Sequence, residues 1–145
     1  MESVSITMSE TERQEYLAGV HVGVMAIERG ERAPLAVPIW YAYEPGGLLR
    51  ILIGPDSLKA KLLAVSGRFS LCAQSEKPPY RYVMVEGPIV DTRQCDIETD
   101  ARMMARRYLG KTGGDVFVEE GDDSGMLCVS MRPDIWYSVD YGKAG

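Results

Sequence analysis

The chain has 145 residues, a net charge of −5, 46% hydrophobic and 26% charged residues. These values are ordinary for a globular protein, and we expect residues 1–145 to form a single domain. The acidic balance argues against a nucleic-acid-binding protein, because binding to a phosphate backbone requires a basic surface.

The first third of the chain predicts a short helix and a hairpin. Ser9 and Glu12 form a capping-box pattern, which predicts a helix over about 11–19. Alternating apolar residues then predict a strand over 20–27, a glycine-containing turn, and a return strand over 35–43. A proline inside the return strand indicates an edge position or a bulge.

The next segment predicts a strand over 48–53 that runs directly into a helix. The helix is expected to begin at Ser57 and to end at Gly67. Its apolar residues with 4-then-3 spacing are expected to face the core: Leu58, Leu62 and Val65.

The second half predicts more strands and one longer helix. The helix is expected over about 96–109, with Ile97, Ala101, Met104 and Tyr108 on its core side. The glycine- and acid-rich segment 110–125 is expected to be flexible and partly disordered. The remaining strands are expected over 69–74, 80–91, 126–131 and 135–141.

These elements predict a mainly β (α+β) fold. Most connections are as short as hairpin turns, so the sheet should be largely antiparallel. Six or seven strands in so short a chain are best protected from edge pairing by closing into a barrel, with two or three short helices outside it. A dinucleotide-binding fold is excluded because helices and strands do not alternate.

The cysteine count and the lengths of the apolar runs indicate the cellular compartment and whether a metal site is expected. The odd count of three cysteines matches no metal-site spacing, so we expect neither disulfides nor a metal site. No apolar run approaches the ~20 residues that cross a bilayer, and the first residues lack a signal-peptide core. We therefore expect a cytoplasmic protein without membrane contact.

Ser57, Lys59 and Lys61 are the leading candidates for a binding site. The first turn of a helix presents unpaired backbone N–H groups and the positive end of the helix dipole, which favours an anion such as phosphate. Two lysines two positions apart point to different sides of a helix, so Lys59 is the better candidate. The alternative is a surface helix with two solvated lysines.

Other residues are weaker candidates for binding. Pro38 to Trp40 offer apolar side chains and backbone amides for a planar ring, although the aromatic residues of this strand could equally fill the core. Arg81 between Tyr80 and Tyr82 could hold an anion or pair with a carboxylate. His21 is better explained as structural than catalytic, and Arg106-Arg107 as a solvated helix face. No nucleophile motif is present, so an enzymatic role requires a cofactor.

Three segments together resemble the split β-barrel flavin-binding family, which includes pyridoxamine 5′-phosphate oxidase and the flavin/deazaflavin-dependent reductases. They are the run VGVMAIERGERAPLAVPIWYAYEPGGLLRILIGPDSLKAKLL and the later FSLCAQ and RYVMVEGPIV, and the resemblance covers about residues 16–142. It implies a split β-barrel and a homodimer with the cofactor at the subunit interface.

The resemblance also implies where the cofactor would lie. Its phosphate would be near Ser57 and Lys59, and its ring against residues 38–40 and the strand end at 52–53. The segment RYVMVEG resembles the oxidase pattern R-Q-V-x-x-E-G, with Tyr82 in place of the ring-contacting glutamine. The expected cofactor-binding residues are Pro38, Ile39, Trp40, Leu52, Ile53, Ser57, Lys59, Lys61, Tyr80, Arg81 and Tyr82.

Departures from the oxidase pattern favour a different cofactor. The arginine and lysine of the oxidase's second strand are replaced by apolar and aromatic residues, and its S-R-K has become Ser57-Leu58-Lys59. Lys59-Ala60-Lys61 resembles the K-x-R spacing of the deazaflavin-binding branch. We therefore expect coenzyme F-420 in preference to FMN, and hydride transfer to a small electron-poor molecule. The alternatives are an FMN-dependent oxidase-like enzyme, a non-catalytic binder of flavin, deazaflavin or haem, and a structural dimerisation domain.

Overall fold

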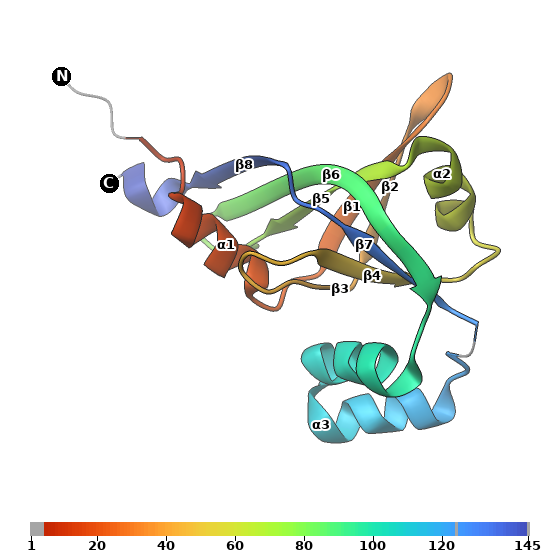
Figure 1. Ribbon diagram of the computed structural model, residues 1–145. Helices are drawn as coiled ribbons and strands as arrows, with labels where there is room; N and C mark the ends of the chain where they lie inside the picture. Colours follow the sequence, from red (N-terminus) through yellow and green to blue (C-terminus); the bar gives the residue numbers. More distant parts are fainter. Residues whose placement is uncertain (1–4, 124, 145) are drawn as a thin grey trace.

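The computed structural model describes residues 5–123 and 125–144. Within them, eight strands form one antiparallel sheet with the order β2-β1-β5-β6-β7-β4-β3, and β8 pairs with β6 (Figure 1). Three α-helices accompany the sheet, which confirms the expected mainly β fold. The elements are α1 (Glu10–Ala18), β1 (Gly23–Arg29), β2 (Arg32–Ile39), β3 (Tyr41–Ala42), β4 (Leu49–Ile53), α2 (Leu58–Ser66), β5 (Arg68–Gln74), β6 (Arg81–Gln94), the π-helical turn η1 (Ile97–Ala101), α3 (Arg102–Glu120), β7 (Leu127–Met131), β8 (Ile135–Asp140) and the 3-10 turn η2 (Tyr141–Ala144).

The chain itself joins the two ends of this sheet. β2 and β3 lie at opposite ends of the strand order, yet Trp40 is the single residue between them. The return strand expected over 35–43 is therefore two strands that pair with different neighbours, β2 with β1 and β3 with β4. The edge position of β2 agrees with the proline at position 38, which has no N–H to donate to a further strand.

β6 is the longest strand and connects the two halves of the barrel. Its first part pairs with β5 and β8, and its last part pairs with β7. The strand passes through Gly87 without a break. A Cβ atom on Gly87 would overlap the backbone carbonyl of Arg132, so the close approach of the segment after β7 requires glycine at this position.

The core lies inside the curved sheet and follows the expected alternation. Gly23, Met25 and Ile27 of β1 face inward, whereas Val24 is exposed. Tyr41 on β3 is fully buried, and its hydroxyl donates to the carbonyl of Leu17 at 2.6 Å. This bond attaches α1 to the barrel and satisfies the buried phenol.

The helix α2 begins and ends as expected but buries a different face. Ser57 is its N-cap and Gly67 its left-handed C-cap, with φ 67°. Leu63 is its buried residue, whereas Val65 is 90% exposed and Leu58 is 50% exposed. The expected core face was therefore wrong for Leu58 and Val65, whereas Leu62 packs against the core as expected. The run of apolar residues permits two neighbouring faces, and packing against β1 and β5 selects the one centred on Leu63.

The segment 110–125 was expected to be flexible and partly disordered, and this was wrong for residues 110–120, which belong to α3. α3 includes Gly110 with φ 78° and ψ 173°, a conformation outside the helical region. The chain reverses there and continues as a second helical arm to Glu120, so that η1 and α3 form a helical hairpin below β3 and β4 (Figure 1). Position 124 lies outside the described residues.

An ion-pair network and one glycine hold the two arms together. Asp115 of the second arm accepts from Arg102 at 2.9 Å and from Arg106 at 2.7 Å. Arg106 and Arg102 hold the pKa of the Asp115 carboxyl at about 2. Gly114 is buried, and a Cβ atom there would lie 2.5 Å from the backbone nitrogen of Arg106. The expectation that Arg106 belongs to a solvated helix face was therefore wrong.

Replacing Gly114 with alanine is expected to separate the arms. The added methyl group would collide with backbone, so we expect Gly114→Ala to lower the free energy of unfolding by about 2 kcal/mol. Gly113→Ala is the matched control, because Gly113 is exposed and alanine favours a helix by up to about 1 kcal/mol over glycine. Urea unfolding followed by circular dichroism measures both. Equal stability of the two variants would contradict the close contact.

Candidate functional site

The outer face of the β3–β4–β7 part of the sheet faces the helical hairpin. Pairing places Ala42 opposite Arg50, and Leu52 opposite Cys128. Because side chains alternate along a strand, Arg50 and Leu52 project to the face opposite the buried Ile51. This outer face therefore combines an arginine with small and apolar side chains.

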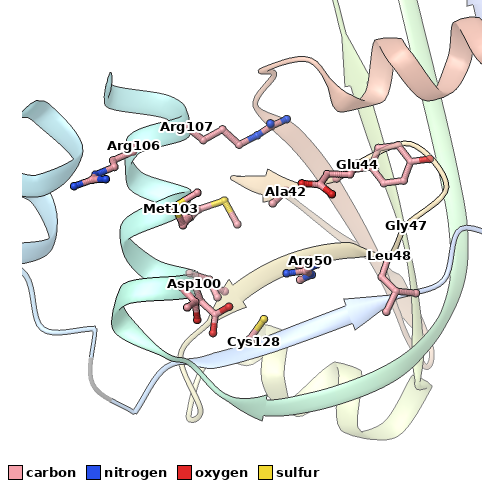
Figure 2. Close-up of a pocket in the computed structure, with 14 residues that line it drawn as sticks. Ala42, Glu44, Gly47, Leu48, Arg50, Asp100, Met103, Arg106, Arg107 and Cys128 are labelled. Carbon is pink, nitrogen blue, oxygen red and sulfur yellow. The ribbon is translucent and has the colours of Figure 1, made fainter. Parts of the chain in front are cut away.

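A cavity of about 490 Å³ lies between this face and the hairpin (Figure 2). The sheet provides Arg50, Leu52 and Cys128, and the loop before β4 provides Glu44 and Leu48. The hairpin provides Thr99, Asp100, Met103, Met104, Arg106 and Arg107. Figure 2 shows Met103 on the hairpin side of the cavity and Arg50 on the sheet side. The cavity is therefore mostly apolar with charged groups at a few positions, as is typical of small-molecule sites.

One ion pair, between a buried carboxylate and a partly exposed guanidinium, connects the hairpin to the sheet beside this cavity. The two guanidinium NH groups of Arg93 on β6 donate to Asp100 at 2.6 and 2.9 Å. The backbone N–H of Asp96 also donates to Asp100, at 2.8 Å. The Asp100 side chain is 4% exposed, and the hydrogen bonds from Arg93 lower the pKa of its carboxyl despite burial. Asp100 is thus ionised at neutral pH, with its charge balanced by Arg93.

Two of the arginines that line the cavity are held by hydrogen bonds to other parts of the protein. Arg106 is turned away from the cavity toward the second arm (Figure 2), where its Nε donates to Asp115 at 2.7 Å. Arg107 donates to the carbonyls of Ala18 and Gly19 at 3.0 and 2.7 Å. The Arg107 side chain is therefore a structural brace, and the expectation of a solvated position was wrong for it too.

A second, smaller cavity adjoins the first. Its volume is about 230 Å³, and it shares Leu52 and Met104 with the larger one. Its other lining residues are Ile39, Trp40, Ala101, Ala105, Phe117, Asp123 and Met126. The two cavities thus form neighbouring spaces on the same side of the sheet.

Trp40 in the smaller cavity is held by two hairpin aromatics. Its ring stacks on Tyr108 at 4.8 Å between centroids with an interplanar angle of 5°, and Phe117 lies at 5.5 Å. The Tyr108 hydroxyl donates to the carbonyl of His21 at 2.6 Å and accepts from the backbone N–H of Tyr41 at 3.0 Å. One face of the indole is therefore covered by Tyr108, so a ligand in this cavity has access only to the remaining surface of Trp40.

The structure brings together some of the residues expected to contact the cofactor ring. Ile39, Trp40 and Leu52 all line the smaller cavity. Ile53 points into the core with 2% exposure, so its side chain cannot contact a ligand on this face. Pro38 is exposed on the edge strand β2.

The expected phosphate site lies beyond the end of β4, outside the lining of either cavity. The Ser57 hydroxyl donates to the carbonyl of Gly54 at 2.7 Å and accepts from the backbone N–H of Ala60 at 3.2 Å. Lys59 is half-buried on the side of α2 that carries Leu63, and Lys61 is exposed. Ser57 is thus a helix cap in this structure, and Lys59 is better placed than Lys61 to contact a ligand against the sheet.

The third group of expected residues belongs to the other half of the barrel. The Arg81 guanidinium lies over the ring of Tyr16 at 5.5 Å, and Tyr82 stacks on Tyr137 at 6.0 Å. Tyr80 is 51% exposed just before β6. None of the three borders either cavity.

His21 has a structural role, as the sequence analysis favoured over a catalytic one. Its Nε2 lies 3.0 Å from the carbonyl of Tyr16, to which it donates, and its ring stacks on Tyr16 at 4.5 Å. Burial lowers the pKa of this imidazole. His21 is therefore neutral at physiological pH and connects α1 to the start of β1.

Sequence reasoning missed Arg50, Asp100 and Met103. Arg50 carries the clearest signal, since it is the one charged residue in the apolar strand 48–53. Asp100 and Met103 gave no signal, because their role depends on the hairpin docking against the sheet. Residues 5–123 and 125–144 contain no cluster of three side chains suited to hold a metal ion, and no helix among them is long and apolar enough to span a bilayer.

Comparisons with known proteins show similarity in structure but not in sequence. No protein-family model matches the chain, and no curated protein matches its sequence. A solved F420 reductase is 20% identical, with coverage of 86% of this chain and 94% of that one and a TM-score of 0.68. A pyridoxamine 5′-phosphate oxidase-like protein from Listeria innocua is 14% identical, with coverage of 89% and 96% and a TM-score of 0.64. An FAD-binding protein from Mesorhizobium loti is 16% identical, with coverage of 91% and 93% and a TM-score of 0.62.

This chain has the split β-barrel fold of these proteins. The fold that the sequence resemblance implied is thereby confirmed over most of the chain. At these identities the likeness concerns the fold, and the function is argued from the site itself.

The Arg93–Asp100 pair is expected to control the attachment of the hairpin. Asp100→Asn should lower the free energy of unfolding at pH 7 by about 2 kcal/mol, because a buried group loses charge-assisted bonds. Since the pKa of Asp100 is below its ordinary value of 3.8 in the folded state, its stabilisation is present above pH 3.8 and is lost as the pH falls through the lower folded value. The difference between the two proteins should therefore shrink in acid.

Asp91→Asn is the matched control for that experiment. Asp91 lies 3.9 Å from the Nε of the same arginine but is 55% exposed, so its removal should change stability little. Urea titrations from pH 3 to pH 7 measure the three proteins. An Asp100→Asn effect that is equal at both ends of this range would contradict the assignment.

Proposed function

We propose that the protein is an oxidoreductase that uses a flavin-type cofactor, with coenzyme F-420 preferred over FMN, and that it reduces a small electron-poor organic molecule. The observation that carries the proposal is the position of β4. This strand places Leu52 in the cavity that Trp40 lines and then leads, within five residues, to the capped helix start at Ser57. An apolar cavity and an anion-binding helix end are thus joined by one short segment.

The residues at the helix start fit a phosphate. The Ser57 hydroxyl satisfies the N–H of Ala60, which leaves the N–H groups of Leu58 and Lys59 in the first turn for an external acceptor. Lys59 adds a positive charge at the same place, and the helix dipole favours an anion there. These residues would hold the phosphate-bearing chain of either coenzyme.

The cavities fit the other parts of such a reaction. Ile39, Trp40 and Leu52 provide apolar contacts for the edge of a planar ring, and the larger cavity beside them has room for a second molecule. The bound cofactor would supply the hydride, and the chain would orient the reactants and exclude water. Burial raises the pKa of the Cys128 thiol, so this group stays protonated and provides no nucleophile in the cavity.

The likeness to an F420 reductase and the Lys59-Ala60-Lys61 spacing support F-420. An FMN-dependent oxidase-like enzyme is the second candidate, supported by the likeness to a pyridoxamine 5′-phosphate oxidase-like protein. A protein that binds a flavin, deazaflavin or haem without turnover is the further alternative.

We also propose that the protein is a homodimer in which the cofactor lies at the subunit interface. Pairing aligns Val24, Cys72, Met84 and Tyr137 across β1, β5, β6 and β8 on the outer side of the sheet. Val24 is 39% exposed, Tyr137 is 57% exposed and the nearby Ile135 is 58% exposed. A contiguous apolar surface of this kind is typical of a contact between proteins. A second copy would cover it.

Cofactor binding can be tested by titrating the purified protein with F-420 and with FMN and recording absorbance and fluorescence. We expect F-420 to bind more tightly than FMN. Lys59→Ala should weaken binding about tenfold or more, as is typical when a charge-assisted hydrogen bond is lost. Ser57→Asp should weaken it as well without unfolding α2, because aspartate caps a helix but repels phosphate. Lys111→Ala, on the exposed part of the hairpin, is the control.

Failure of both coenzymes to bind more tightly than millimolar would rule out the proposed function. If cofactor binding is unchanged by Lys59→Ala and Ser57→Asp, the proposal of a flavin-type cofactor would stand, but the proposed phosphate site would be overturned. Binding without reduction of any electron acceptor would favour the non-catalytic alternative.

The dimer can be tested by sedimentation equilibrium. We expect a dimer for the natural protein and a shift toward monomer for Val24→Asp, because an unpaired carboxylate would be buried at the interface. Val116→Asp on the hairpin introduces the same charge at a position that is 45% exposed, and it should leave the dimer intact. A natural protein that sediments as a monomer would contradict the interface.

A further inference from the structure

The positive charge of Arg50 contributes to lowering the pKa of Asp100, but no short contact with a described residue holds its guanidinium. Within residues 5–123 and 125–144 it makes no hydrogen bond or ion pair, in contrast to the other arginines at the cavity. Its side chain is exposed and lies on the cavity side of β4 (Figure 2). A guanidinium presents two parallel N–H groups that match a carboxylate in geometry and in charge.

The surrounding charges favour a ligand with one negative charge. Asp100 is neutralised by Arg93, and Arg106 is neutralised by Asp115. Arg107 is held by backbone carbonyls and adds a positive charge to the wall. Glu44, in the loop before β4, is exposed and disfavours a ligand with a high negative charge. One free guanidinium in this setting suits a monocarboxylate better than a phosphate dianion.

The rest of the cavity requires an apolar body on this ligand. Leu52 and Met104 line both this cavity and the smaller one, and Met103 lines this cavity. Met103 is 60% exposed, and flexible methionine side chains adapt to ligands of irregular shape. A volume of about 490 Å³ is within the range of sites for drug-sized molecules.

We propose that the larger cavity binds a small apolar monocarboxylic acid, with the carboxylate on Arg50 and the hydrocarbon or aromatic body against Met103, Met104 and Leu52. This arrangement directs the body of the acid toward the cavity that contains Trp40. That the acid is the substrate rests on the proposed function, whereas its binding at Arg50 does not. In that case the electron-poor group that is reduced would lie at the end of the molecule distant from its carboxylate.

The test compares 2-naphthoate with its neutral analogue 2-naphthalenemethanol, by isothermal titration calorimetry on the natural full-length protein. We expect the acid to bind at least about tenfold more tightly than the alcohol. Arg50→Gln should weaken binding of the acid by about 10- to 100-fold, the effect of losing a bidentate charged pair, and should leave the alcohol unchanged. Arg50→Lys should retain part of the affinity. Arg32→Gln, which removes an exposed arginine from β2, is the control for net charge.

An effect of Arg50 on acid binding is distinguished from an effect on cofactor binding by repeating the F-420 and FMN titrations with Arg50→Gln. A loss of acid binding in Arg50→Gln together with unchanged cofactor affinity would support the proposal. If neither coenzyme binds the natural protein, the loss of acid binding alone would support it. Equal affinity for the acid and the alcohol would overturn it, as would equal losses in Arg50→Gln and Arg32→Gln. A selective loss of cofactor affinity in Arg50→Gln would assign this arginine to the cofactor's acidic chain and would also overturn it.

Discussion

The bidentate bond between Arg93 and Asp100 sets the geometry of the candidate site. It connects the long central strand β6 to the first turn of the helical hairpin, and both cavities occupy the space between that hairpin and the sheet. The Asp100 carboxylate is buried, so water cannot replace its hydrogen bonds. It is held by the guanidinium of Arg93 and by the backbone N–H of Asp96. The hairpin is consequently supported at one end by charge.

The aromatic contact of Trp40 with Tyr108 supports the hairpin at its other end. Tyr108 fills part of the space where a planar cofactor was expected, and its hydroxyl also satisfies backbone groups of His21 and Tyr41. With the hairpin held at both ends, the cavities between these supports are a preformed feature of the chain. Preformed sites bind small molecules with less loss of conformational entropy than sites that must be ordered on binding.

Much of the fold could be predicted from local sequence patterns. The helix ends at Ser9, Ser57 and Gly67 depend on short-range hydrogen bonds, and the alternation in β1 depends on which face is buried. The second arm of the hairpin could not be predicted in this way. Its order comes from Asp115 meeting two arginines of the first arm and from the close backbone contact at Gly114, and neither contact is visible as a local pattern.

The residues of the candidate site also differ in whether a local sequence pattern could predict them. Trp40 and Leu52 were found because they belong to strands with recognisable patterns, whereas the roles of Arg50 and Met103 arise only when two distant segments face each other across the cavity. Trp40 also occupies the single position between the two end strands of the sheet. Since no ladder of hydrogen bonds joins β2 to β3 there, the covalent chain and the packing of Trp40 against Tyr108 close the barrel at this residue.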